Sequence, residues 1–315
     1  IATNLLKNNF SIVGYDLKLE CRRELEANGG TSVSSTTEVA DEADVLITSL
    51  PGALALDTVM DDVLKSNRPD HVLIETSTLT LDQKLEAANR LALAGKSLLD
   101  CPISGTPPML ASMTASIYVS GDKELYERCL SVFEGFSATS FFVGPVGNGT
   151  RMKLLANYLV HVHTTAAAEC IVMGEKAGLA PDLIYQALKP GAGGSKMFEV
   201  RGAMMAKSDY REGGGTMFEI FKKDSAIITE FAASVDAPID LYSVAREKLN
   251  SAIELGFGHL DTSAVCKAVE VAAEYLYQAN MPLVYGLSNI TCEAQRNAVA
   301  LAEWVGGVVD SHTSL

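Results

Sequence analysis

Residues 144–157 read GPVGNGTRMKLLAN, and the chain changes character at this stretch. Before it, short apolar runs alternate with segments of helical periodicity, whereas after it strand signals nearly vanish. Alternation of strands and helices predicts an α/β domain, and the second part predicts an all-helical one. We therefore expect two domains, joined by one long helix from about Thr150 to Gly178.

Six apolar runs before this junction are predicted to be strands. Continuous apolar strands separated by helices are typical of a parallel, doubly wound sheet that is buried on both faces. We therefore predict a Rossmann-like, NAD-binding domain over residues 1–145. The predicted strands are Ser11–Asp16, Asp44–Ser49, His71–Thr76, Ser97–Pro102, Ser116–Val119 and Ser140–Val143.

Residues 146–272 are predicted to form the all-helical domain, for substrate binding and oligomerisation. Its further helices are expected at Pro181–Leu188, Thr216–Val235 and Leu241–Leu255, with a loop at 189–194. Residues 273–315 predict a linker helix and the incomplete start of another α/β domain. That start comprises a strand at 282–287, a helix at 293–307 and a strand at 307–310.

The composition excludes several classes of function. A net charge of −14 disfavours nucleic acid and anionic membranes as partners. The six cysteines form no CxxC pair and the five histidines are scattered, so we expect no metal site. No apolar run is long enough to span a membrane, and the cysteines fit buried thiols in a reducing compartment. We therefore expect a cytoplasmic protein.

Part of a dinucleotide site is visible near the start of the chain. Such a site needs a glycine-rich turn after the first strand and an acidic residue after the second. Asp16 ends a predicted strand, as the ribose-binding acid does, although a simple turn role is equally open. An acid there favours NAD over NADP, a preference that Lys18 could soften. The glycine turn would precede Ile1, so we expect an N-terminally truncated domain that binds its cofactor weakly.

Lys153 and Asn157 are the candidate catalytic pair. They lie four residues apart and therefore share one face of the predicted helix, while Gly147 and Gly149 allow a tight entry into it. A desolvated lysine has a pKa of roughly 7–8, which suits proton transfer from a hydroxyl. The alternative is that Lys153 is an ordinary solvated lysine.

Small polar residues follow two of the predicted strands. Ser104 and Gly105 follow Asp100-Cys101-Pro102, and Ser77 and Thr78 follow the strand that ends at Thr76. Ligands of parallel sheets bind at the carboxyl ends of the strands, so these residues are candidates for substrate and cofactor contacts. Ordinary strand-end turns would look the same, and Lys223 on a later helix fits a solvated face equally well.

Together these segments resemble the beta-hydroxyacid dehydrogenase family over about residues 1–271. Residues 147–157 are similar to its G-x-G-x-x-x-K-x-x-x-N signature, and 100–105 to its D-A-P-V-S-G loop. Further segments of the family are similar to residues 75–78, to the Lys223-Asp224 pair and to residues 256–267. The resemblance loosely favours the threonate branch, through residues 163–169.

This resemblance implies a role for each candidate residue. Lys153 looks like the catalytic lysine. The implied substrate-binding residues are Ser104, Gly105, Thr106 and Asn157, and the implied cofactor-binding residues are Asp16, Leu50, Pro51, Ser77, Thr78 and Lys223. The resemblance further implies a small hydroxy acid as substrate and a homodimer or homotetramer.

Two departures from the family pattern stand out. Thr106, Met109 and Met113 occupy positions where the family usually has glycine, which would reshape the substrate loop. Residues 281–315 lie outside the resemblance and are instead similar to the start of the molybdopterin-type domain of formylmethanofuran dehydrogenase.

The leading hypothesis is therefore an oxidoreductase that transfers a hydride between NAD(P) and a small 3-hydroxy acid. That acid would be like 3-hydroxyisobutyrate, threonate or tartronate semialdehyde, with Lys153 as the proton-transfer residue. Two alternatives stay open. One is an imine reductase, which shares the architecture but usually replaces the lysine. The other is a non-catalytic, cofactor-poor scaffold or oligomerisation fragment.

Overall fold

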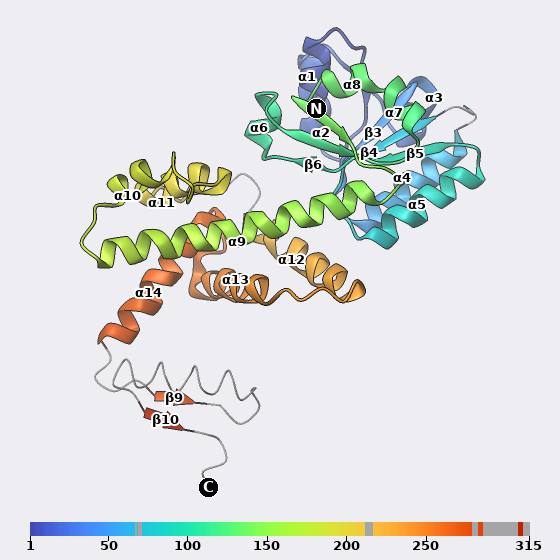
Figure 1. Ribbon diagram of the computed structural model, residues 1–315. Helices are drawn as coiled ribbons and strands as arrows, with labels where there is room; N and C mark the ends of the chain where they lie inside the picture. Colours follow the sequence, from blue (N-terminus) through green and yellow to red (C-terminus); the bar gives the residue numbers. More distant parts are fainter. Residues whose placement is uncertain (67, 69–70, 212–216, 279–282, 286–307, 311–315) are drawn as a thin grey trace. The chain divides into compact units, whose positions relative to one another are not determined.

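A computed structural model describes residues 1–66, 68, 71–211, 217–278, 283–285 and 308–310 (Figure 1). The chain divides into two compact units. The first comprises Ile1–Leu159 and Asp224–Pro238, and the second comprises Val160–Lys223 and the chain from Ile239 onward. The domain boundaries drawn from the sequence, 145/146 and 272/273, stay predictions.

The first unit is built around the parallel sheet that the apolar runs predict. Strands β3 (Val45–Thr48), β4 (Val72–Glu75) and β5 (Ser97–Asp100) pair in that order, all parallel. Helix α4 (Ala53–Lys65) follows β3 and helix α5 (Leu81–Leu93) follows β4. Because the strands are parallel, their carboxyl ends, Thr48, Glu75 and Asp100, lie in register at one edge.

The sheet is covered on both faces, as a doubly wound fold requires. Val72 and Ile74 pack with Phe133 and Phe136 on one face, while Leu73 between them packs on the other. Side chains alternate across a strand, so one apolar run supplies both cores. The other helices that lie wholly within this unit are α1 (Ala2–Lys7), α2 (Leu19–Ala27), α3 (Thr36–Glu42), α6 (Pro107–Ala111), α7 (Lys123–Arg128) and α8 (Leu130–Glu134).

Two smaller strand groups complete the first unit. Strand β1 (Val13–Gly14) pairs in parallel with β2 (Thr31–Ser32), which lacks an apolar pattern and was not predicted. Strand β7 (Ser116–Val119) pairs in parallel with β8 (Thr139–Phe142). The short strand β6 (Ile103–Ser104) runs antiparallel to β7, because the chain turns back directly after β5. A single bridge between Asp100 and Ser120 connects β5 to this group.

Helix α9 (Asn148–Lys176) is the long helix expected after the junction, and it contributes residues to both units (Figure 1). Its end is closed as the sequence predicts. Gly178 has a φ of +84°. The Gly178 amide donates to the Glu175 carbonyl, and the Leu179 amide donates to the Gly174 carbonyl. This left-handed closure satisfies carbonyls that the helix itself leaves without donors.

In the described residues, the second unit consists mostly of helices. Helix α10 (Pro181–Leu188) has the predicted bounds. Helix α12 (Met217–Ser234), which contributes residues to both units, lies within its predicted range, and α13 (Asp240–Ala252) begins one residue before its predicted start. The remaining helices are the π-helices η1 (Phe198–Gly202) and η2 (Ile253–Phe257), the 3₁₀-helix η3 (Thr262–Ala264), α11 (Ala203–Ala206) and α14 (Val265–Gln278). Their core includes Ile171, Phe198 and Leu249. Among the described residues, no helix is both long and apolar enough to cross a bilayer.

The last described residues form a parallel pair, β9 (Leu283–Tyr285) with β10 (Val308–Asp310). These strands coincide with the two predicted near the end of the chain. The helix predicted at 293–307, and most of the segment that resembles formylmethanofuran dehydrogenase, lie outside the described residues.

Candidate active site

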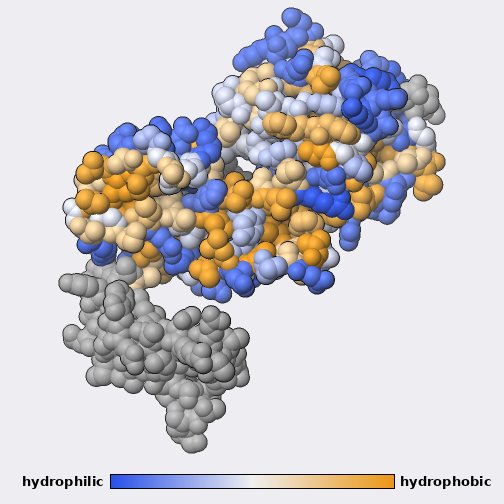
Figure 2. Space-filling model, viewed as in Figure 1, coloured by the Kyte–Doolittle hydropathy of each residue, from blue (hydrophilic) through white to orange (hydrophobic). Residues whose placement is uncertain are grey.

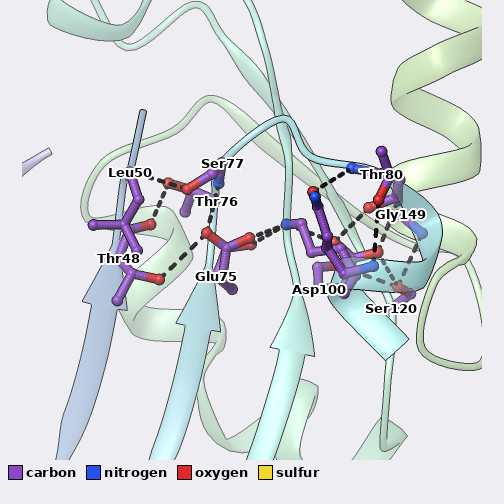
Figure 3. Close-up of polar contacts among 12 residues, drawn as sticks. Thr48, Leu50, Glu75, Thr76, Ser77, Thr80, Asp100, Ser120 and Gly149 are labelled. Carbon is purple, nitrogen blue, oxygen red and sulfur yellow. Dashed lines mark hydrogen bonds and ion pairs between the residues drawn. The ribbon is translucent and has the colours of Figure 1, made fainter. Parts of the chain in front are cut away.

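The start of α9 is fixed to the carboxyl edge of the sheet by side chains from two strand ends. The Thr150 amide donates to Asp100 Oδ2 at 2.8 Å, and the Thr150 hydroxyl donates to Asp100 Oδ1 at 2.9 Å. The Gly149 amide donates to the Ser120 hydroxyl at 2.9 Å (Figure 3). The first amides of a helix have no partner within it, and a carboxylate there also complements the helix dipole. Asp100 and Ser120 therefore act together as the cap of α9.

The two glycines of the motif have separate physical reasons. Gly147 has a φ of +91°, a conformation that strains any other residue. Gly149 approaches the sheet so closely that a Cβ would lie 2.5 Å from the Asp100 carbonyl oxygen and 2.7 Å from that of Tyr118. The first glycine thus makes the turn, and the second allows the contact between helix and sheet.

Lys153 and Asn157 follow on the next turns of this anchored helix. Lys153 lies three residues beyond Thr150, about 4.5 Å along the axis, and is half-buried. Asn157 is 7% exposed, and its amide nitrogen donates to Asp224 Oδ2 at 2.7 Å. Asp224 is also buried, so this contact fixes the orientation of the Asn157 amide. Of the Lys223-Asp224 pair noted in the sequence, Asp224 thus positions the Asn157 side chain.

His161 lies on the same helix, and its ring is engaged in the helical core. Its Nδ1 lies 2.9 Å from the Tyr242 hydroxyl, and its ring meets that of Phe221 edge-on at 4.8 Å. These contacts give His161 a structural role in the helical core.

The predicted substrate loop leaves the sheet just after Asp100. Ser104 ends β6 and is half-buried, Gly105 is exposed, and Thr106 immediately precedes α6. A Cβ on Gly105 would lie 2.8 Å from the Cβ of Ala115, so this glycine allows the loop to pack on the start of β7. Met113, where the family usually has glycine, has a φ of +60°, which is unusual for a side chain of this size.

The predicted cofactor-side residues of the first unit lie on three loops. The Ser77 hydroxyl accepts from the Leu50 amide at 2.7 Å, which joins the loops after β3 and β4. Pro51 and Asp16 are exposed, and Thr78 is half-buried. The Asp16 carboxylate follows β1 and accepts from the Lys18 amide at 2.8 Å, so it also makes the turn considered as the alternative. Lys223 is exposed on α12 and belongs to the second unit.

Sequence reasoning missed the buried charges behind this edge. Lys84 of α5 contacts Glu75 Oε2 and lies 3.1 Å from Asp100 Oδ1, and all three side chains are fully buried. Glu75 Oε1 also accepts from the Ser77 amide at 3.1 Å (Figure 3). The sequence did carry a signal for the burial of Lys84, because this residue lies on the same apolar face of its helix as Ala87 and Leu91.

Cys101 follows Asp100 and is an unreactive thiol. Burial raises its pKa well above the ordinary value, and the neighbouring Asp100 carboxylate raises it further. The thiol therefore stays protonated at neutral pH, as expected for a small buried hydrophobe. In the described part of the chain, no cluster of His, Cys, Asp or Glu is suited to a metal ion.

A cavity of about 350 Å³ lies elsewhere in this unit, where β4 and β5 begin. It is lined by His71, Val72, Gly95, Ser97, Leu125 and Arg128. Ligands of parallel α/β sheets bind at the opposite, carboxyl edge. We therefore place the candidate site at the edge that carries Glu75, Asp100 and the start of α9.

Two family models match the chain, one in each half. Residues 1–144 match the NAD-binding domain of 6-phosphogluconate dehydrogenase. Residues 147–269 match the NAD-binding domain of NADP-dependent 3-hydroxyisobutyrate dehydrogenase. The two matches meet at residues 144–147, where the strand pattern of the sequence gives way to a helical one.

Individual relatives agree with these matches. The chain is 28% identical to an L-threonate dehydrogenase of Cupriavidus necator over 271 residues, which are 85% of this chain and 91% of that protein. The structure of 3-hydroxyisobutyrate dehydrogenase from Salmonella typhimurium is 28% identical, with a TM-score of 0.75, and the match covers 84% of this chain and 94% of that one. The Mycobacterium tuberculosis 3-hydroxyisobutyrate dehydrogenase, determined with L-serine, is 25% identical with a TM-score of 0.77 and coverages of 85% and 94%.

These matches confirm the predicted fold class, a Rossmann-like domain followed by a helical domain. The same matches also confirm the prediction that the chain is an enzyme that uses NAD(P). Over residues 1–144 and 147–269 the chain is thus similar to dehydrogenases of the beta-hydroxyacid type, and it is an NAD(P)-dependent oxidoreductase.

Proposed function

We propose that the chain transfers a hydride between NAD and a small 3-hydroxy acid, with Lys153 as the proton-transfer residue. The observation that carries this proposal is the anchoring of α9. Its first turn is capped by Asp100 and Ser120 from the edge of the sheet, and Lys153 follows one turn later. Ligands bind at this edge in open α/β sheets, so the lysine is fixed next to the expected place of the substrate.

The residues at this edge suit a dinucleotide. Asp16 presents an exposed carboxylate directly after β1, where ribose hydroxyls would find an acceptor. Leu50, Pro51, Ser77 and Thr78 would line the nicotinamide side, on two loops that are already joined by the Leu50–Ser77 hydrogen bond. An acid at residue 16 disfavours a 2′-phosphate, so the proposed cofactor is NAD rather than NADP. Lys223 is proposed as a further cofactor contact.

The chain's own residues would bind and orient the acid and move its proton. Ser104, Gly105 and Thr106 would hold the carboxylate through hydroxyl and amide donors. Asn157, held by Asp224, would orient the reacting hydroxyl. In the direction of oxidation, the neutral Lys153 amine would accept the hydroxyl proton as the carbonyl forms. The bound dinucleotide supplies the acceptor for the hydride.

The proposed assembly is a homodimer or homotetramer. Met152, Leu155 and Leu159 are exposed at helical spacing on α9, and therefore share one face. Other exposed apolar residues appear as orange areas on the face seen in Figure 2. An exposed apolar stripe of this kind is typical of surfaces that bind another protein chain.

A substrate panel tests the proposal. The protein is mixed with NAD⁺ or NADP⁺ and with 3-hydroxyisobutyrate, L-threonate or glycerate (the reduced form of tartronate semialdehyde), and NADH or NADPH formation is followed. The proposal predicts turnover of at least one acid, faster with NAD⁺. A second arm mixes the protein with NADH or NADPH and a cyclic imine and follows oxidation of the cofactor. Turnover in this arm alone would support the imine reductase alternative. Absence of both turnover and NADH binding would support the scaffold alternative.

A further inference from the structure

Lys84 is a buried cation between two buried carboxylates. Its ammonium contacts Glu75 Oε2 and lies 3.1 Å from Asp100 Oδ1, and none of the three side chains is exposed to solvent. Charged groups lose their hydration when they are buried, so such a cluster persists only where the charges compensate each other and the hydrogen bonds are made. Lys84 thus allows two carboxylates to lie side by side at the end of the sheet.

The charges extend to the start of α9. Two carboxylates and one ammonium leave one negative charge, and the amino end of α9 offsets it, since the Thr150 amide and hydroxyl both donate to Asp100. The network therefore comprises Glu75, Lys84, Asp100 and Thr150, and we call it the anchor network. Removal of its ammonium would leave Asp100 and Glu75 to repel each other directly below the helix.

The anchor network also reaches the cofactor-side loops. The Ser77 amide donates to Glu75 Oε1 at 3.1 Å, and the Ser77 hydroxyl accepts from the Leu50 amide at 2.7 Å. A continuous series of contacts thus runs from Leu50 through Lys84 to Thr150, three residues before Lys153. Figure 3 labels Leu50, Ser77, Glu75 and Asp100 of this series. At one end of this series, Leu50 and Ser77 would contact the nicotinamide. At the other end, the helix that begins at Thr150 carries Lys153, which would move the proton.

We propose that Lys84 is a positioning residue for hydride transfer, which fixes the start of α9, and with it Lys153, relative to the loop that begins at Ser77. This inference rests on the proposed function of Lys153. Lys84 does not touch the reacting groups in this scheme, and it acts through Asp100 and Glu75. A displacement of about 1 Å at reacting groups slows an enzyme by about a hundredfold. Loss of the anchor network should therefore lower kcat by about 10- to 100-fold and change KM by less than about threefold.

The test variant is Lys84→Met combined with Glu75→Gln. This pair removes one cation and one anion, so no two buried carboxylates are left to repel each other, but Asp100 loses the ammonium that fixes its position below the Thr150 amide. The matched control is Leu91→Ala, two turns further on the same buried face of α5. The control destabilises the helix packing through a cavity but leaves the anchor network intact.

Three quantities are measured on both variants: kcat with KM, the midpoint of thermal unfolding, and hydrogen exchange at the Gly149 and Thr150 amides. The proposal predicts the stated loss of kcat and faster exchange at these amides in the double variant. The Leu91→Ala control should keep kcat within about threefold, even where its midpoint falls as far. A folded double variant with wild-type kcat, or an equal loss of kcat in the control, would overturn the proposal.

The exchange measurement separates this inference from the proposed function. A wild-type protein that turns over no hydroxy acid would contradict the proposed function. Faster exchange at Gly149 and Thr150 in the double variant alone would still support the anchoring of α9 by Lys84. Unchanged exchange there would contradict it.

Discussion

Gly149→Ala should separate the catalytic helix from the sheet. A Cβ at this position would lie 2.5 Å from the Asp100 carbonyl oxygen and 2.7 Å from that of Tyr118, and both atoms belong to backbone that cannot rotate away. A contact of about 3.4 Å requires a separation of about 0.9 Å. The hydrogen bond from the Thr150 amide to Asp100, now 2.8 Å, would then lengthen to about 3.7 Å and be lost.

The energetic cost follows from these displacements. A hydrogen bond to a charged group contributes about 1.5–3 kcal/mol, and overpacking costs about 1–3 kcal/mol. We expect the free energy of unfolding to fall by about 3–5 kcal/mol, measured by urea titration. Because Lys153 lies one turn further along α9, kcat should fall by about 10- to 100-fold.

Gly178→Ala is the matched control at the other end of α9. Gly178 also has a positive φ, but a Cβ there would meet nothing within 4 Å. This variant should lose about 1 kcal/mol through backbone strain alone and keep wild-type kcat. Equal stability and equal kcat in the two glycine variants would refute the argument from close contact.

Three further predictions concern the cofactor, a buried amide pair and a buried histidine. Asp16→Ser should reduce the ratio of kcat/KM for NAD⁺ to that for NADP⁺ by about tenfold or more, measured by initial rates, because the 2′-phosphate would no longer meet a carboxylate. Asn157→Asp should lower the free energy of unfolding at neutral pH by about 3 kcal/mol, because two buried carboxylates would then face each other. Adding Asp224→Asn to this variant should restore its stability, and urea titrations measure both effects. Burial, and then the nearby Lys96 cation, lower the pKa of His71, so the unfolded chain takes up a proton before the folded one does as the pH falls below about 6.5. Stability should therefore fall with decreasing pH by at most about 1.4 kcal/mol per unit from this group. His71→Gln should reduce the slope of thermal stability against pH.

Elements with a strong periodic pattern could be predicted from the sequence. The apolar runs predicted β3, β4 and β5, because a strand buried on both faces needs apolar residues throughout. Helix α10 has its predicted bounds, since Pro181 marks its start. Strand β2 was missed because Thr31 and Ser32 carry no apolar signal, and η1 because its π-helical geometry has no sequence pattern that we used.

The candidate site could be predicted only where it follows a local motif. One short stretch contains Lys153, Asn157 and the two glycines. Their spacing alone therefore placed the glycines at the start of the helix and the other two residues on one of its faces. The cap of α9 joins Asp100 to Thr150, which are 50 residues apart, and no local pattern gives such a partner. Lys84 was visible as a charged residue on an apolar helix face, but its partners Glu75 and Asp100 follow only from the register of β4 and β5.

The most direct test of the account is kcat of Lys153→Met with the acid identified in the panel, beside NADH binding by fluorescence titration. Methionine keeps the length of the side chain and removes the group that moves the proton. The account predicts that kcat falls by about 10²- to 10⁴-fold while the dissociation constant for NADH stays within about threefold. Lys153→Arg should be nearly as slow, because its guanidinium keeps its proton at any working pH. Turnover by Lys153→Met at close to the wild-type rate would contradict the account.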